Sequence, residues 1–279
     1  MSTPWRRVTH LSTDERNAVL AFLDRCESDL SREAIDENRR RAILHDRPAE
    51  HWLRVDGASL TGYAQGSKAS VYEVEQAGGG VDADLLATIQ EDHATVDFWV
   101  RGSQAVPDGG RSIRVIELLS IPLPVPTVPL PAGATLRPFE IGVDEERWLA
   151  QNNAAFADHP EQGAWKRDDL DLRLRDDWFD PSGFLLMFLD GTLAASCWTK
   201  IHELHRDRAG EIYVISVDPA FQGLGIGRVI VTQGLASLSR RGVRRGILFV
   251  EKTNEPARAL YREIGFELVR EDGVLRFGA

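Results

Sequence analysis

A run of closely spaced prolines divides the chain. Residues 119–133 read LSIPLPVPTVPLPAG, with five prolines between Pro122 and Pro131. Each proline fixes φ and removes a backbone donor, so we expect this segment to be extended and semi-rigid. The chain has 279 residues, and a typical domain has roughly 150. We therefore predict two domains, residues 1–118 and 134–279, joined by a linker at 119–133.

Composition narrows the class of protein. Hydrophobic residues make up 43% and charged residues 27%, as in globular proteins. The net charge of −10 argues against a nucleic-acid partner, because such partners need clustered Lys and Arg. No apolar run approaches membrane-spanning length, and two cysteines, Cys26 and Cys197, are too few for a disulfide framework. We expect a cytoplasmic protein that acts as a monomer, with no membrane partner.

The second half alternates strand-like and helix-like runs. Asp190-Gly191 between two apolar runs predicts a hairpin, and a change of period at Gly225 predicts a helix after a strand. Helical openings at 13–25 and 143–157 hint that an α+β unit is duplicated. The predicted order in the second half is strands 184–189, 192–200 and 211–217, a helix from Gly225 to Arg241, strand 247–250, helix 255–264, and a second hairpin at 266–277 around Asp272-Gly273.

The stretch VDPAFQGLGIGRVIV, residues 217–231, joins a strand to a helix through three glycines. Free amides at the positive end of a helix dipole bind anions, and glycine lets a phosphate approach them closely. The spacing is neither the dinucleotide fingerprint nor a Walker loop. Two interpretations stay open here, a pyrophosphate site or a tight turn that brings strand and helix together.

Two motifs resemble those of the GCN5-related N-acetyltransferases. Residues 222–227 (QGLGIG) resemble the Q/R-x-x-G-x-G/A signature, and residues 254–266 (NEPARALYREIGF) resemble the second signature. The resemblance implies an α+β fold of two tandem domains, each a mixed, mostly antiparallel sheet flanked by helices. It also implies acetyl-CoA as co-substrate, without a metal. The coenzyme contacts it implies are Ile215, Ser216, Val217, Gln222, Gly223, Leu224, Gly225, Ile226, Gly227, Arg228, Asn254, Glu255, Pro256, Ala257, Arg258 and Ala259.

Four further stretches resemble the mycothiol synthase family, actinobacterial enzymes with tandem acetyltransferase domains. They are NNAAFADHPEQGAW (152–165), WFDP (178–181), WTK (198–200) and EIYV (211–214). The resemblance covers about residues 135–270, and the first half matches in outline only. It implies acetylation of the cysteinyl amine of a cysteinyl-glucosaminyl-inositol, the last step of mycothiol synthesis.

Acetyl transfer to an amine needs a base for the ammonium, support for the oxyanion and an acid for the thiolate. The resemblance assigns the base to Glu211 and the acid to Tyr261, and the Val217 amide is our candidate for polarising the thioester carbonyl. Without the resemblance, Glu211 is equally a solvated strand-end charge and Tyr261 a half-buried core residue.

The acceptor contacts implied by the resemblance are Glu33, Glu161, Lys200, Glu211 and Phe249. The resemblance implies a tyrosine at the position of Phe249, so a hydroxyl contact would be lost there. Glu161 and Lys200 are also compatible with an ordinary surface role, and the alignment around Glu33 is ambiguous. His159, His202 and His205 lack metal-ligand spacing, so no metal site is expected.

The first half departs from the pattern. After a predicted strand at 70–74 its loop reads EQAGGGV (75–81), without the signature spacing, and Asp82 and Asp84 place negative charge where an anion would bind. We predict a degenerate domain that supports the fold, and one acetyl-CoA site per chain. Two alternative functions remain, acetylation of another amine such as a protein N-terminus, and a non-catalytic module that senses coenzyme A.

Overall fold

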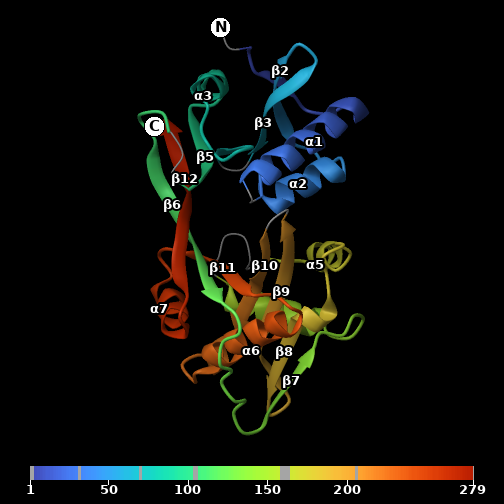
Figure 1. Ribbon diagram of the computed structural model, residues 1–279, viewed down its shortest axis with the longest axis vertical. Coiled ribbons are helices and arrows are strands. Elements are labelled where there is room, and N and C mark those ends of the chain that lie inside the picture. The colour runs from blue at the N-terminus through green and yellow to red at the C-terminus, as the bar shows by residue number, and fades with distance from the viewer. Residues whose placement is uncertain are drawn as a thin grey trace.

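One continuous mixed sheet runs through the molecule. The computed structural model describes residues 3–30, 33–68, 71–102, 106–157, 164–204 and 207–278. Within these ranges twelve strands lie in the order β1-β2-β3-β4-β5-β12-β6-β11-β10-β9-β8-β7 (Figure 1). Neighbours are antiparallel except β4–β5 and β10–β11, which are parallel. The strands are β1 (Arg6–Val8), β2 (Glu50–Asp56), β3 (Ser59–Lys68), β4 (Tyr72–Gln76), β5 (Thr95–Arg101), β6 (Arg111–Pro122), β7 (Ala134–Pro138), β8 (Phe184–Leu189), β9 (Thr192–Leu204), β10 (Asp207–Val217), β11 (Arg245–Glu251) and β12 (Glu267–Gly278).

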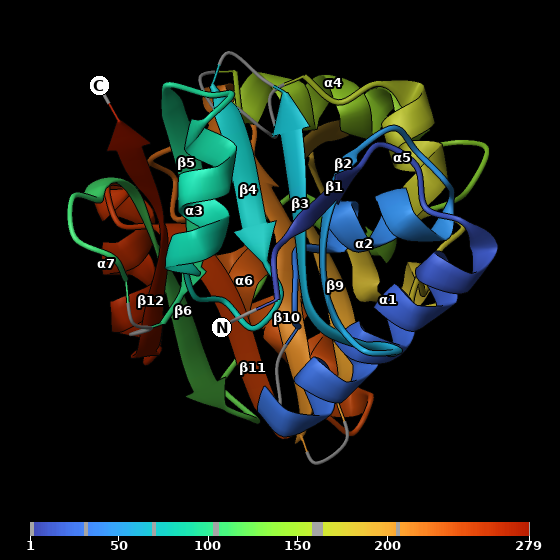
Figure 2. The ribbon, with the colours of Figure 1, turned by 90° about the horizontal axis from the view of Figure 1, so that it is seen from above.

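Helices cover both faces of the sheet. They are α1 (Thr13–Leu30), α2 (Glu37–Leu44), α3 (Ala83–Gln90), α4 (Glu145–Ala155), α5 (Arg167–Arg173), α6 (Ile226–Arg240) and α7 (Glu255–Ile264). Alternate residues of β8 show the two faces of the second half: Leu185 and Met187 enter the core under α6 and α7, while Phe184 and Leu186 enter the core under α4 and α5. In the first half α3 packs on one face, and α1 and α2 on the other (Figure 2). No helix in the described ranges is long and apolar enough to cross a membrane.

The two halves exchange strands at the centre of the sheet. β12, the last strand of the chain, lies between β5 and β6, and β6 lies between β12 and β11. Phe277 of β12 therefore belongs to the core of the first half, where its ring meets Phe98 edge to face at 6.2 Å between centroids. Leu119 and Ile121 of β6 in turn belong to the core of the second half. Each half borrows part of its core from the other, and pairing through β5, β12, β6 and β11 joins the two halves into one sheet.

The hairpin expected at 266–277 is wrong, because β12 is a single strand. Asp272 and Gly273 pair with β5 on one side and with β6 on the other. The Asp272 carboxylate accepts from the Gly102 amide at 2.9 Å and from Arg270 at 2.8 Å, so it is satisfied without a turn. A Cβ on Gly273 would lie 2.6 Å from the Arg114 carbonyl oxygen. Glycine is needed here for close strand approach, which local sequence does not distinguish from a turn.

The proline-rich segment begins later than expected. β6 continues to Pro122, so residues 119–122 are strand rather than linker. The rest of the segment packs on α6, where the Val128 amide donates to the Thr232 hydroxyl at 3.1 Å and its carbonyl accepts from Gln233. The division at this segment stays a prediction, because strand exchange ties both halves into one sheet.

The local elements of the second half are confirmed. β8 and α7 have the predicted bounds, and Asp190 and Gly191 both adopt positive φ in the tight turn before β9. The helix at 143–157 begins slightly later, at Glu145, and α6 ends one residue early, at Arg240. β9 continues to Leu204, four residues beyond the predicted end at Lys200. That extension matters for the site, because it brings His202 into the strand.

Candidate active site

The parallel strands β10 and β11 separate soon after they meet. In the described part of the chain they pair only at Gly210↔Gly246 and Glu211↔Ile247. The register of β10 against β9 then shifts between Ile212 and Val214, a β-bulge that bends β10. From there to Val217 one edge of β10 has no strand partner, so its backbone can pair with an extended ligand as an added strand would.

The glycine turn lies at the end of this free edge. Gly223 and Gly225 have φ of 76° and 77°, and a Cβ on either would meet nothing within 4 Å. The left-handed backbone, not crowding, therefore selects glycine at both positions. Gly225 is the N-cap of α6 and offers no side-chain oxygen, so no side chain caps the helix. Exposed amides at an uncapped helix start fit a pyrophosphate.

Gly227 serves a different purpose, because a Cβ there would meet Leu260 of α7 at 3.2 Å. The close-packing interpretation thus applies at Gly227, and the pyrophosphate site at Gly223 and Gly225 stays a prediction. Ile226 is buried in the core, so only its backbone is available to a ligand, and the Arg228 side chain is ion-paired with Glu263. The Ser216 hydroxyl is held by Ser196 at 2.9 Å and by Gln151, so it too offers its backbone.

The second motif forms the start of α7. Asn254 is its N-cap, and its side chain accepts from the Ala257 amide at 3.2 Å. Arg258 is held by two bonds to Glu117 of β6, at 2.7 and 2.8 Å, and Glu255 pairs with Arg258. Pro256, Ala257 and Ala259 lie in the first two turns. These residues have structural roles in this state, and their coenzyme contacts stay a prediction.

Tyr261 lies inside the core rather than in the cavity described below. It is buried, and its ring contacts Phe266 edge to face at 5.7 Å. Burial raises the pKa of its phenol, followed by a smaller contribution from Cys197. Among the described residues no hydrogen bond holds its hydroxyl. The core interpretation of this residue is thus supported, and its catalytic role stays a prediction.

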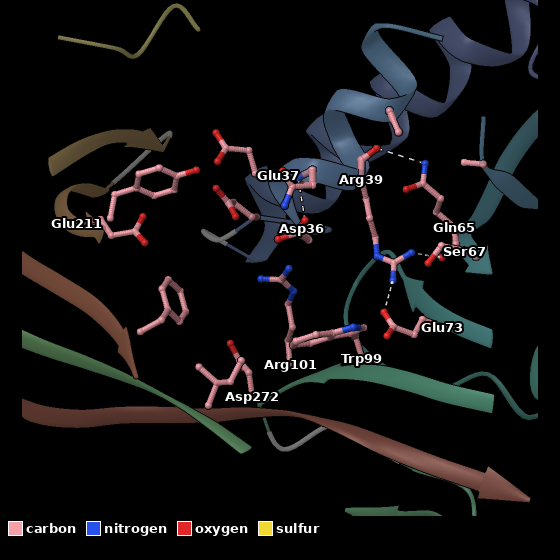
Figure 3. A pocket seen from close by; sticks show the side chains of 18 of the residues that line it. Asp36, Glu37, Arg39, Gln65, Ser67, Glu73, Trp99, Arg101, Glu211 and Asp272 are labelled. Carbon is pink, nitrogen blue, oxygen red and sulfur yellow. Dashed lines mark hydrogen bonds and ion pairs between the residues drawn. The ribbon is translucent and has the colours of Figure 1, made fainter. Parts of the chain in front are cut away.

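A cavity of about 510 Å³ lies between the two halves (Figure 3). One wall comes from the second half and carries Lys200, Glu211 and Phe249. The opposite wall comes from the first half, where Arg39, Gln65 and Glu73 face across from Glu211 in Figure 3. The remaining lining residues are Glu33, Asp36, Glu37, Asn38, Ala42, Pro48, Ala49, Gly66, Ser67, Trp99, Arg101, Ile116, Tyr213 and Asp272.

Four of the five predicted acceptor residues meet in this cavity: Glu33, Lys200, Glu211 and Phe249. Glu161 lies outside the described residues. Phe249 of β11 lines the cavity and is 41% exposed, so an apolar ring forms part of the wall there. Glu211 is buried, not a solvated strand-end charge as its alternative interpretation required.

Lys200 is the centre of an ion network. Its Nζ lies 2.7 Å from Oε1 of Glu37 and 3.7 Å from Oε1 of Glu33. Burial alone would lower the pKa of Lys200, but the carboxylates of Glu33 and Glu37 raise it on balance. The ammonium also lies over the Trp178 ring, 4.9 Å from its centroid. Lys200 is therefore a charged, buried group, and the ordinary surface role is wrong for it.

The residue that sequence reasoning missed is His202. Its Nε2 lies 2.6 Å from Oε2 of Glu211, and its Nδ1 lies 3.8 Å from Oε1 of Glu33. The predicted strand ended at Lys200, two residues short of it. Side chains two apart share a face of a strand, so a longer predicted β9 would have placed His202 beside Lys200 and Glu211. His159 and His205 lie outside the described residues.

In the first half, a side-chain carboxylate occupies the corresponding helix start. Asp82 caps α3, and its carboxylate accepts from the amides of Asp84 and Leu85 at 3.0 Å each. Trp5 donates to the same carboxylate at 3.2 Å and Arg54 at 2.6 Å. The amides that hold a phosphate in such folds are thus satisfied internally. Glu75, expected in the loop, lies buried in β4 and pairs with Arg101.

Comparison with known proteins decides the family. A sequence profile of the acetyltransferase (GNAT) family matches residues 148–266. The mycothiol acetyltransferase of Thermobispora bispora is 36% identical over 272 residues, which cover 90% of this chain and 92% of that relative. The chain belongs to the mycothiol acetyltransferase family.

Other members of the mycothiol acetyltransferase family are more alike over a shorter stretch. That of Thermomonospora curvata is 47% identical over 165 residues, 58% of this chain, and the match spans about half of that relative, 54%. A solved tandem GNAT protein from the clavulanic acid biosynthesis pathway has a TM-score of 0.68 and 16% identity, covering 98% of each chain. The fold is thus that of a tandem GNAT protein, as the α+β prediction has it.

Proposed function

We propose that the chain transfers the acetyl group of acetyl-CoA to the cysteinyl amine of a cysteinyl-glucosaminyl-inositol, with the chemistry in the second half. The observation that carries this is the free edge of β10, which leads from the uncapped amides of α6 to the buried carboxylate of Glu211. An acyl donor and an amine would meet where that edge reaches the cavity.

The glycine turn is proposed to bind the diphosphate of the coenzyme. Residues 223–225 are exposed at the start of α6, whose N-cap Gly225 has no side-chain oxygen, so no acidic cap competes for the amides there. The amides and carbonyls of Ile215 and Val217 then pair with the extended arm of the coenzyme, and the Val217 amide supports the developing oxyanion.

Glu211 is proposed to accept a proton from the acceptor ammonium. The neutral amine then attacks the thioester carbonyl carbon, and the carbon–sulfur bond breaks as the thiolate leaves with its electron pair. The Tyr261 phenol, whose pKa is raised by burial, is protonated at neutral pH and so has a proton to give to that thiolate. The amide nitrogen then gives up its remaining extra proton, which restores the Tyr261 phenol, and Glu211 releases the ammonium proton to solvent. The products are the amide, free coenzyme A and one proton, with both side chains returned to their starting states.

The acceptor end of the cavity suits a polyol with an amine. Carboxylates, amides and hydroxyls of both halves line it, including Asp36, Gln65 and Ser67, and such groups bind sugar hydroxyls through hydrogen bonds. Trp99 provides an aromatic wall for a ring. We further propose that the protein acts as a monomer in the cytoplasm, where its two cysteines stay reduced.

The test is a direct assay with purified full-length protein and acetyl-CoA. Desacetylmycothiol, a peptide with a free N-terminus and an aminoglycoside are offered separately, and products are read by mass spectrometry. Reagents that detect the thiol of released coenzyme A are unsuitable for following the reaction, because the acceptor itself carries a thiol. We expect one added acetyl group on desacetylmycothiol, on nitrogen, with the product thiol still free to alkylation. Acetylation of another amine alone would contradict the acceptor, and tight coenzyme binding without any turnover would favour a sensor.

A further inference from the structure

His202 of β9 lies between two carboxylates that come from different halves of the chain. Its Nε2 is 2.6 Å from Glu211, and its Nδ1 is 3.8 Å from Glu33, which precedes α2. The histidine side chain is 11% exposed, as is that of Glu211. Because bulk water is largely excluded, these polar contacts are stronger than they would be at the surface.

The surroundings of His202 favour its protonated form. Burial alone would lower its pKa, but the hydrogen bond to Glu211 and the charges of Glu211 and Glu33 raise the pKa on balance. Lys200, two residues earlier on the same strand, opposes this shift with its positive charge. In the protonated ring both nitrogens are donors: Nε2 is within hydrogen-bond distance of Glu211, and Nδ1 is at ion-pair distance from Glu33.

We propose that His202 is a positioning residue that fixes the Glu211 carboxylate for proton transfer. This rests on the proposed function, in which Glu211 accepts the ammonium proton. His202 donates to Oε2, so Oε1 stays available to the amine. Without that bond the glutamate side chain has several rotamers, and misplacement of a reacting group by about 1 Å can cost about 100-fold in rate.

His202 also supplies the counter-charge that the cavity requires. Glu33, Glu37 and Glu211 are three carboxylates in one partly buried space, and like charges there repel one another. Lys200 is committed to Glu37 at 2.7 Å. His202 is the group in hydrogen-bond contact with Glu211, and Glu33 lies 3.8 Å from its other ring nitrogen. Through that contact the non-catalytic half takes part in setting the geometry of the base.

The test compares two substitutions of His202 in the full-length protein. His202→Gln keeps an N–H donor but no titratable charge, whereas His202→Phe keeps a ring but no donor. His10→Gln is the matched control, because the His10 side chain is 71% exposed. For the acceptor that the wild type uses, we expect His202→Phe to lower kcat roughly 10- to 100-fold with the KM for acetyl-CoA nearly unchanged. His202→Gln should recover most of kcat and remove one titration step from the pH profile of kcat.

Two kinetic outcomes would overturn the inference. One is a wild-type kcat in His202→Phe, and the other is a His202→Gln protein as slow as His202→Phe. A second measurement does not depend on turnover. The ¹⁵N signals of His202, identified by their loss in His202→Gln, are titrated by NMR in the wild type and in Glu211→Gln. We expect the pKa of His202 to fall in Glu211→Gln, and an unchanged value would also overturn the inference.

The two proposals fail separately. If no offered amine is acetylated by the wild type, the proposed function is wrong, whereas the titration still decides whether His202 and Glu211 form a pair. If His202→Phe does not fold, as judged by its circular dichroism and melting, the Gln variant and the titration decide the outcome alone.

Discussion

The Lys200 ammonium and the Glu37 carboxylate lie 2.7 Å apart, although 163 residues separate them in the chain. Lys200 belongs to β9 of the second half, and Glu37 begins α2 of the first. Trp178 donates to the same carboxylate at 2.9 Å, and Arg173 donates to Asn38 at 3.0 Å. These contacts bridge the halves beside the cavity, so its acceptor wall exists only when both halves are in place.

Replacing Lys200 should destabilise the protein and weaken acceptor binding. In Lys200→Met the half-buried Glu37 keeps its charge and its contact with Arg41 but loses its nearest cation, which costs up to about 3 kcal/mol of unfolding free energy. Urea unfolding measures this, and the KM for the acceptor should rise. Lys252→Met is the control, since Lys252 and its partner Glu271 are 47% and 41% exposed, and such pairs are worth less than about 1 kcal/mol. Equal losses in the two variants would contradict the bridging role.

Glu211→Gln should abolish most turnover while leaving the coenzyme bound. A positioned base contributes roughly 100- to 10,000-fold to rate, and the amide cannot accept the ammonium proton. We expect kcat to fall by about that factor, with the affinity for acetyl-CoA unchanged in a calorimetric titration. Glu203→Gln, an exposed glutamate of the neighbouring strand, serves as the control. A Glu211→Gln protein with full activity would exclude the carboxylate as base.

Gly225→Ala should weaken acetyl-CoA binding specifically. Gly225 has φ of 77° and open space around its Cβ position, so alanine adds backbone strain of about 1 kcal/mol without a clash. Gly191→Ala is a matched control, because Gly191 has φ of 81° and equal space, but lies in the β8–β9 hairpin. Both variants should lose similar stability, whereas only Gly225→Ala should raise the KM for acetyl-CoA. Equal KM values for acetyl-CoA in the two variants would show that the glycine turn is not part of the coenzyme site.

Tyr261→Phe should separate catalysis from packing. The hydroxyl has no partner among the described residues, so its removal should change the melting temperature little. If the phenol protonates the thiolate, kcat should fall about 10- to 100-fold, within the lower range for general acids. Because burial raises its pKa, the phenol stays protonated, and the wild type should not lose activity through Tyr261 as pH rises toward 9. An unchanged kcat in Tyr261→Phe would contradict the role of the phenol as acid and leave Tyr261 with a packing role alone.

One molecule of acetyl-CoA should bind each chain. The α3 start is capped by Asp82, whose pKa is lowered: burial acts to raise it, but hydrogen bonds from Leu85, Trp5 and Arg54 prevail. A second coenzyme would have to displace that carboxylate and bring more negative charge beside it. Calorimetry with the wild type should give a stoichiometry near one, and Gly225→Ala should weaken that single site. Two sites in the wild type would contradict our account of the first half.

Local sequence determined the elements that bear the chemistry. The Asp190-Gly191 turn, the glycine run and the Asn254 cap encode their conformations within a few residues, through positive φ and side-chain caps, so the second half could be predicted closely. The wrong hairpin at Asp272-Gly273 has the same origin, since the glycine there serves a neighbouring strand and only pairing with β5 and β6 reveals it.

Tertiary structure alone decided how the site is assembled. Contacts between residues more than a hundred positions apart decide which core β12 enters. Such contacts also bring Glu33 and Glu37 to face Lys200, His202 and Glu211. Such contacts leave no periodic signal in the chain, because burial and charge pairing are properties of the surfaces that meet. The sequence determined which groups could react, and the packing of the two halves decided which of them stand together.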